Sequence, residues 1–307
     1  MRRLGLLAIA TALLLAGVVA PAQASHRVPI GGGQMTPAQA QRVANYWTPA
    51  RMRSALPASA LAGHLSARSD QPPRATISSR PVAETILPPY NTAGRIFARI
   101  GQYNFWCSGV AVNTPGRRLV LTAGHCLWNL LPRHRRPSAA RDLQFAPAYS
   151  KGQAPYGSFV MEEGFVLGQW KNRFNPNYDM GAIVTYPNAL GQGIADAVGG
   201  GATLAINKSK DQVFQVLGYP GANQQRMQEC DGVFAGNSPV SRYYSGPAQL
   251  TATCFLLPGA SGGPWFAGEP PQLYGLSSED LTLQAHDHYI TSPYFSSATV
   301  GALTKGL

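Results

Sequence analysis

The sequence predicts an all-β fold of two antiparallel β-barrels, which follow an N-terminal leader and end in one short helix. The chain has 307 residues, of which 45% are hydrophobic and only 13% are charged, and it contains 33 Gly and 25 Pro. This composition favours short strands and tight turns over long amphipathic helices. Short apolar runs recur from residue 94 onward, and turn residues separate nearly all of them. A glycine-rich stretch at 191–201 marks the boundary between the two predicted barrels.

Residues 1–24 have the pattern of a secretory signal peptide. A pair of arginines precedes an apolar run over 4–20, and then Pro21 and the small-residue pattern Ala22-Gln23-Ala24 follow. We therefore expect export to the extracellular space and removal of this segment, which leaves no membrane anchor. The pair of arginines leaves open whether export uses the general or the twin-arginine route.

Residues 25–90 form a leader of different composition, without Cys and rich in Ala, Pro, Ser and Arg. Thr36-Pro37 predicts the N-cap and first residue of a short helix that ends near Trp47. We expect this leader to be a propeptide, partly helical or disordered, which delays activity or assists folding. A linker without such a role is the alternative. We expect the processing site between Arg74 and Asn91.

The net charge of +11 is distributed unevenly along the chain. Residues 1–90 carry nine Arg against Asp70 and Glu84, a net charge of +7. Residues 91–307 carry 16 Lys and Arg against 12 Asp and Glu, a net charge of +4. Because we expect the first part to be removed, the remaining protein is only mildly basic, and we expect no nucleic-acid partner.

The rest of the chain divides into two predicted barrels, 91–190 and 191–307. The apolar runs of the first barrel predict strands at 95–100, 106–113, 119–122, 158–161, 164–168 and 179–186. Those of the second barrel predict strands at 203–206, 213–218, 249–256, 263–267 and 273–277. The tail, 296–307, predicts a terminal helix.

Three stretches carry side chains suited to nucleophilic catalysis. His125 follows the apolar run 119–121, and Asp179 stands at the head of another apolar strand. Ser261 lies among three glycines in Pro258-Gly259-Ala260-Ser261-Gly262-Gly263-Pro264-Trp265. A serine hydroxyl becomes a good nucleophile only beside a base, and backbone N–H groups must stabilise the oxyanion that it creates. A histidine with a pKa near 6.5 suits the role of that base at neutral pH.

The three motifs, in the order His, Asp, Ser, resemble the trypsin-like (chymotrypsin-fold) serine peptidases over about residues 91–307. The resemblance is closest to the secreted bacterial branch that includes the glutamyl endopeptidases. It implies a secreted, monomeric endopeptidase that cleaves proteins or peptides without a cofactor, through an acyl-enzyme on Ser261. His125 would be the general base and acid, and Asp179 would orient the imidazole. The N–H groups of Gly259 and Ser261 would form the oxyanion hole.

Four cysteines in an exported chain predict two disulfides rather than metal ligands or reactive thiols. Of the three possible connectivities we choose Cys107–Cys126 and Cys230–Cys254, because each pair would lie within one barrel. The resemblance implies the first of these bridges, whereas the second departs from the usual spacing. No C-x-x-C motif or His/Cys cluster suggests a metal site.

The resemblance places the substrate pocket beside Ser277 and Ser278, on the strand that follows the serine motif. Glutamyl endopeptidases carry a histidine on this strand, and Ser277 stands in its place here. The segment 255–257 before the serine motif carries no acid that would bind Arg or Lys. We therefore expect a mostly apolar or small first subsite. Glu279 and Asp280 at the pocket mouth leave a preference for basic substrates as the alternative.

Two other interpretations compete with a peptidase. Gly259-Ala260-Ser261-Gly262-Gly263 also fits the nucleophile elbow of esterases, which requires a helix directly after the serine. However, Gly262-Gly263-Pro264 is a poor helix start, and only 46 residues follow the serine. The second alternative is a catalytically weak or inactive binding protein on the same fold. Such proteins usually lack one of the three catalytic side chains, all of which are present here.

Overall fold

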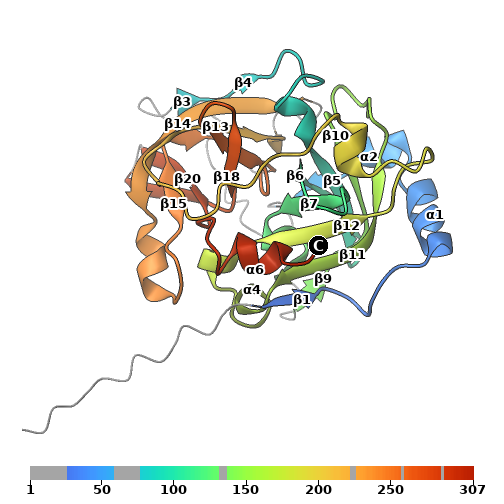
Figure 1. Cartoon of the computed structure of the whole chain (residues 1–307), viewed down its shortest axis with the longest axis horizontal. Helices are drawn as coiled ribbons and strands as arrows, with labels where there is room; N and C mark the ends of the chain where they lie inside the picture. Colours follow the sequence, from blue (N-terminus) through green and yellow to red (C-terminus); the bar gives the residue numbers. More distant parts are fainter. Residues whose placement is uncertain (1–25, 59–76, 131–136, 222–225, 257–258, 285–286) are drawn as a thin grey trace, which may run out of the picture.

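The computed structural model describes residues 26–58, 77–130, 137–221, 226–256, 259–284 and 287–307. The expected signal peptide, residues 1–24, lies outside the described residues, as do residues 59–76 of the leader. Two large β-sheets, two two-stranded sheets and a few short helices make up the described fold, which confirms the predicted all-β class (Figure 1). No helix of the described part of the chain is long and apolar enough to span a membrane.

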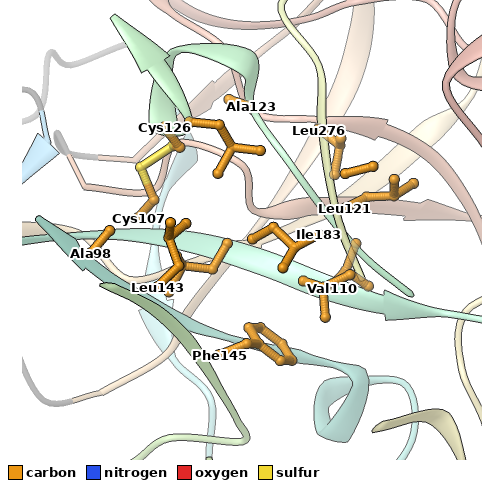
Figure 2. Packing of buried hydrophobic residues seen from close by; sticks show 14 of the residues in the cluster. Ala98, Cys107, Val110, Leu121, Ala123, Cys126, Leu143, Phe145, Ile183 and Leu276 are labelled. Carbon is orange, nitrogen blue, oxygen red and sulfur yellow. A yellow bond between two sulfur atoms is a disulfide. The ribbon is translucent and has the colours of Figure 1, made fainter. Parts of the chain in front are cut away.

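Six antiparallel strands form the first barrel: β5 (Ala93–Ile100), β6 (Tyr103–Val112), β7 (Leu119–Thr122), β10 (Arg141–Pro147), β11 (Phe159–Leu167) and β12 (Gly181–Thr185). The hydrogen-bonded ring runs from β5 through β6, β7, β12, β11 and β10 back to β5, so that the barrel is closed. Side chains such as Val110, Leu143 and Ile183 fill its interior (Figure 2). Leu276 of the second sheet belongs to the same cluster, so this core extends into the second sheet, which also has a separate cluster that includes Phe214 and Trp265.

Seven strands form the second sheet: β13 (Val213–Gly218), β14 (Gln228–Asn237), β15 (Leu250–Ala252), β17 (Pro264–Ala267), β18 (Gln272–Leu276), β19 (Asp280–Gln284) and β20 (Asp287–Ser292). β18 and β19 stand at opposite ends of the strand order but are consecutive in the chain, separated only by residues 277–279. The Ser278 N–H donates to the Thr291 C=O, and the Thr291 N–H donates to the Glu279 C=O, both at 2.8 Å. The interrupted strand therefore closes this sheet into the second barrel.

Short elements connect and cover the barrels: η1 (Tyr90–Thr92), η2 (Gly124–Cys126), β8 (Trp128–Leu130), β9 (Pro137–Ala139), α4 (Gly168–Arg173), η3 (Pro176–Tyr178), α5 (Ile194–Ala197), η5 (Pro239–Tyr243), β16 (Cys254–Phe255) and α6 (Val300–Thr304). The terminal helix α6 is shorter than the predicted 296–307 and packs against β11 and β12 of the first barrel. Both halves of the chain therefore contribute to the outside of this barrel.

The described leader packs against the first barrel. β1 (Arg27–Pro29) pairs antiparallel with β11, and β2 (Leu56–Pro57) pairs parallel with β6. The two helices between them are α1 (Pro37–Tyr46) and α2 (Pro49–Ser54). Thr36 is the N-cap of α1, as the sequence predicts, and a reciprocal capping box with Gln39 satisfies the first-turn N–H groups.

Trp47 anchors this leader in the barrel. Its side chain is only 4% exposed and its ring centroid lies 5.6 Å from that of Phe97 on β5. The indole N–H donates to the C=O of Asp142 at 2.5 Å. An aromatic side chain of this size contributes substantially to a core when it is buried. The leader is therefore part of the folded body rather than a detached tail.

A second part of the leader contacts the second barrel. β3 (Ile77–Ser78) pairs parallel with β16, and β4 (Arg80–Pro81) pairs antiparallel with β14. The Arg80 guanidinium forms ion pairs with Glu229 at 3.0 Å and with Asp231 at 2.9 Å. The described leader therefore contacts both barrels.

Four strand predictions differ from the structure. The predicted strand 249–256 is divided at Thr253 into β15 and β16. The predicted strands 158–161 and 164–168 form the single strand β11, because Glu162 between them is buried and forms an ion pair with Arg118. The predicted strand 203–206 makes only an isolated bridge from Leu204 to Leu273. Polar residues interrupt the apolar pattern of β10, β14, β19 and β20, and these four strands were therefore not predicted.

Candidate active site

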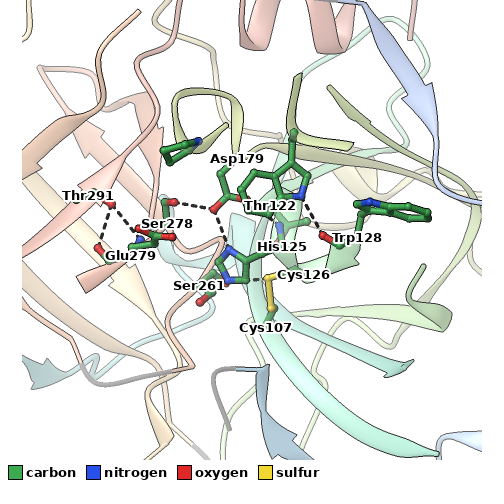
Figure 3. Close-up of polar contacts among 12 residues, drawn as sticks. Cys107, Thr122, His125, Cys126, Trp128, Asp179, Ser261, Ser278, Glu279 and Thr291 are labelled. Carbon is green, nitrogen blue, oxygen red and sulfur yellow. Dashed lines mark hydrogen bonds and ion pairs between the residues drawn. A yellow bond between two sulfur atoms is a disulfide. The ribbon is translucent and has the colours of Figure 1, made fainter. Parts of the chain in front are cut away.

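His125 and Asp179 lie at the ends of two neighbouring strands of the first barrel. β7 leads into the turn of His125, and β12 begins after Asp179, with Thr122 paired to Gly181. The backbone N–H of His125 donates to Asp179 Oδ1 at 2.7 Å, and the imidazole Nδ1 lies 2.8 Å from Asp179 Oδ2 (Figure 3). Because an ionised carboxylate only accepts hydrogen bonds, we assign the proton of the neutral imidazole to Nδ1. Nε2 is then an acceptor.

The carboxylate of Asp179 is fully buried and has a third donor. The hydroxyl of Ser278 donates to its Oδ2 at 2.6 Å. Gly124 leaves room for this arrangement, because a Cβ at that position would lie 3.0 Å from Asp179 Oδ1 and 2.8 Å from the ring of Trp170. The backbone N–H of His125, its ring and Ser278 therefore fix the orientation of the carboxylate.

The pKa of His125 responds to opposing effects. Burial lowers it, whereas the charge and hydrogen bond of Asp179 and the charge of Glu279 raise it, and the net result is a pKa above the usual 6.5. A raised pKa means that the folded state binds this proton more tightly than the unfolded chain does. The pair therefore contributes stability below about pH 6.5, and this contribution is lost as the pH rises through the raised pKa of His125.

Ser261 lies in a tight loop at the boundary of the two barrels. Gly259 and Gly262 have φ angles of +114° and +80°, in the left-handed region that favours glycine. The Ser261 C=O lies 3.8 Å from Sγ of Cys126, the residue after His125. Figure 3 draws Ser261 and the imidazole of His125 near each other, and no hydrogen bond joins these two side chains. Such contacts are often loose before substrate binds. The strand β17 begins at Pro264, where an esterase elbow would require a helix.

The two disulfides have the connectivity chosen from the sequence, Cys107–Cys126 and Cys230–Cys254. The first joins β6 to the turn that carries His125, and so fixes this turn relative to the first barrel. Cys107, His125 and Cys126 are also the one group of His, Cys, Asp or Glu side chains in the described ranges close enough to hold a metal ion. Because the two sulfurs are bonded to each other, they are not thiolate ligands.

A small cavity of about 20 Å³ opens next to the serine loop. Its walls include Ser277 and Ser278, the two residues expected there, together with Leu256, Ala260 and Ile290. These three apolar residues are no more than 3% exposed. The hydroxyl of Ser277 already accepts a hydrogen bond from the Trp265 indole at 3.0 Å. Glu279 and Asp280 also line the cavity, and Glu279 is exposed at the surface.

A family model of the trypsin-like peptidase domain matches residues 107–276, which include all three candidate side chains. The chain belongs to the trypsin-like peptidase family. It is a serine endopeptidase, as the motifs predicted, and its substrates are proteins or peptides.

Three solved structures that are similar to this trypsin-like peptidase are proteases. A thermostable serine protease, AL20, from an extremophilic microorganism is 29% identical with a TM-score of 0.60, over 69% of this chain and 95% of that chain. The protease Anisep from Arthrobacter nicotinovorans is 28% identical with a TM-score of 0.59, over 68% and 91%.

A Glu endopeptidase is 20% identical with a TM-score of 0.57, over 76% of this trypsin-like peptidase and 96% of that chain, and is similar in fold. A search of curated proteins found no match.

Sequence reasoning assigned Ser278 to the substrate pocket but did not foresee its contact with Asp179. It also gave no role to Ser108, whose hydrogen bonds connect β6 to the serine loop. A hydroxyl in an apolar strand, directly after the disulfide cysteine Cys107, is the one signal that singles out Ser108 in the sequence.

Proposed function

We propose that Ser261, His125 and Asp179 are the catalytic triad of this endopeptidase. The Ser261 hydroxyl attacks the scissile carbonyl while His125 Nε2 takes its proton, and the same proton then passes to the leaving amine. Water hydrolyses the resulting ester by the reverse sequence of proton transfers. The observation that supports this proposal is the pair of hydrogen bonds, 2.7 and 2.8 Å, that orient His125 on a buried carboxylate.

The backbone N–H groups of Gly259 and Ser261 would stabilise the oxyanion. The C=O of Ala260 accepts a hydrogen bond from the Gly263 N–H at 2.8 Å. Since the C=O and N–H of one trans peptide point in opposite directions, this bond turns the Ser261 N–H away from Gly263. A side chain at position 259 would meet the C=O of Tyr219 at 2.8 Å, so the loop requires glycine there.

The cavity favours substrates with a small or apolar residue before the scissile bond. Leu256, Ala260 and Ile290 supply apolar walls, and the hydroxyl of Ser277 is already hydrogen-bonded. Cleavage profiling with a peptide library is therefore expected to enrich Ala, Val or Leu at this position. Dominant acidic residues would contradict the proposal, and dominant basic residues would assign Glu279 and Asp280 to the binding of substrate.

The remaining proposals concern maturation. We assign residues 1–24 to a signal peptide, 25–90 to a propeptide, and 91–190 and 191–307 to the two barrels. Secretion agrees with the two disulfides, which persist in oxidising compartments. The mature protein is proposed to be an extracellular monomer that binds neither nucleic acid nor membranes.

Covalent labelling of the secreted protein with a serine-directed fluorophosphonate tests the triad. One adduct per molecule is expected, on the peptide that contains Ser261, and none on protein that was unfolded beforehand. Intact mass of the same sample gives the mature N-terminus. A folded, disulfide-bonded protein that takes no adduct would contradict the proposed activation of Ser261.

Glu279→Gln is expected to extend activity toward lower pH. The charge of Glu279 raises the pKa of His125, so its removal should lower that pKa. Because kcat/KM requires neutral His125, its acid limb follows the pKa downward. The pH profile of kcat/KM measures the shift, and Glu269→Gln, an exposed acid on another loop, is the control that should leave it in place. If the acid limb of the kcat/KM profile of Glu279→Gln stayed at the wild-type pH or moved to higher pH, this would contradict the assignment of the limb to His125.

A further inference from the structure

Ser108 lies on β6, is 1% exposed, and uses all of its polar groups. Its N–H donates to the C=O of Ser261 at 2.7 Å, and its C=O accepts from the Thr122 hydroxyl at 2.8 Å. Its own hydroxyl donates to the C=O of Gly259 at 3.2 Å and accepts from the Tyr219 N–H at 3.0 Å. One residue of the first barrel therefore contacts both ends of the Gly259–Ser261 segment.

Residues 259–262, which form the loop of Ser261, pack directly against Ser108 and its neighbours. A Cβ at Gly262 would lie 2.1 Å from the Thr122 hydroxyl and 2.4 Å from the C=O of Ser108. A Cβ at Gly259 would lie 3.0 Å from the indole nitrogen of Trp106, which also stands on β6. The two glycines allow the loop to approach the first barrel this closely, but they do not restrict its backbone rotation.

We infer that Ser108 is a positioning residue for the oxyanion hole. Its hydroxyl holds the C=O of Gly259, and its N–H holds the C=O of Ser261. The Gly259 C=O belongs to the peptide group that lies between the two that present the proposed oxyanion donors, and the Ser261 C=O belongs to the peptide group that follows them. These bonds therefore restrict the rotation of the donors through the peptide groups next to them. Preorganised donors accelerate acyl transfer because they need no reorientation when charge develops on the carbonyl oxygen. The inference rests on the proposed triad and adds to it a residue that does not touch substrate.

The kinetic signature of such a role is specific. A substrate carbonyl carries little charge before attack, so loosened donors affect the ground-state complex less than the transition state. Loss of the Ser108 hydroxyl should therefore lower kcat and leave KM nearly unchanged. It should leave the acid limb of the pH profile in place, because Ser108 forms no hydrogen bond with His125 or Asp179.

The experiment compares Ser108→Ala and Ser108→Gly with the wild-type chain. Both variants keep the backbone bond to Ser261 and lose the hydroxyl. We expect kcat for a peptide amide to fall about tenfold, a fraction of the loss on removal of a whole donor. KM should stay within about twofold, and the affinity for a peptide aldehyde, whose adduct places an oxygen in the hole, should fall by the same factor as kcat. The control is Ser296→Ala, a buried hydroxyl beside α6 that contacts Thr299, which should leave kcat unchanged.

Unchanged kcat in both folded variants would overturn the inference, and so would a rise in KM without a fall in kcat. Loss of the folded state in both variants, while Ser296→Ala folds, would assign Ser108 a purely structural role and overturn it as well. If the proposed triad itself were wrong, the result would be different, because the wild-type chain would then form no fluorophosphonate adduct.

Discussion

Ser261→Ala is expected to reduce kcat for a peptide substrate by about six orders of magnitude. Its hydroxyl is the proposed attacking group, and the variant has only water as a nucleophile. Residual turnover, from substrate binding and the backbone donors of the loop, should remain above the uncatalysed rate. The change removes one oxygen from a half-buried side chain, so the thermal midpoint of unfolding should stay close to that of the wild-type chain.

Ser296→Ala is the matched control for this measurement, because it makes the same chemical change at a buried position beside α6. It should retain the wild-type rate. Turnover by Ser261→Ala within about tenfold of the wild-type value would mean that another group is the nucleophile.

Asp179→Asn is expected to lower kcat about 10⁴-fold at neutral pH. The carboxylate accepts the Nδ1 proton of His125, whereas the NH₂ of an amide in that place would donate to Nδ1 and keep the proton on Nε2. An imidazole with its proton on Nε2 cannot take the proton of Ser261. The amide also disturbs the other two hydrogen bonds of the carboxylate, which come from the His125 N–H and the Ser278 hydroxyl.

Asp142→Asn provides the comparison for this variant. Asp142 is an acid of the first barrel that forms an ion pair with Arg99 at 3.0 Å and has no contact with His125. Its replacement should leave kcat unchanged. If Asp179→Asn lost less than about tenfold, the tautomer of His125 would not depend on this carboxylate.

Strands with an unbroken apolar pattern were predictable from the sequence. β7 has the predicted bounds, because it is a short apolar run between turn residues. β13 also has the predicted bounds, although one uncharged polar residue, Gln215, interrupts its apolar pattern. β14 was not predicted, since Glu229 and Asp231 interrupt its pattern. Both acids are partners of Arg80, which is far away in the sequence. Such a pairing becomes visible only when the chain is folded.

The residues of the candidate site likewise fall into those that the sequence predicted and those whose contacts it did not indicate. Local motifs were sufficient to select His125, Asp179 and Ser261, because each has a recognisable neighbourhood. The neighbourhoods of Ser108 and Ser278 do not indicate which groups their hydroxyls bind, because their partners are 151 and 99 residues away along the chain. Their roles follow from the way in which the barrels close, which no local pattern specifies.

The way in which the leader is attached bears on how maturation would be detected. Residues 26–58 supply β1, β2 and the buried Trp47 to the first barrel, and Arg80 forms ion pairs with β14. A cut between Arg74 and Asn91 would sever the backbone while leaving the contacts of residues 26–58 intact. The nicked molecule would then elute from a sizing column at an unchanged volume. Denaturing electrophoresis, which separates the two polypeptides, would reveal the cut.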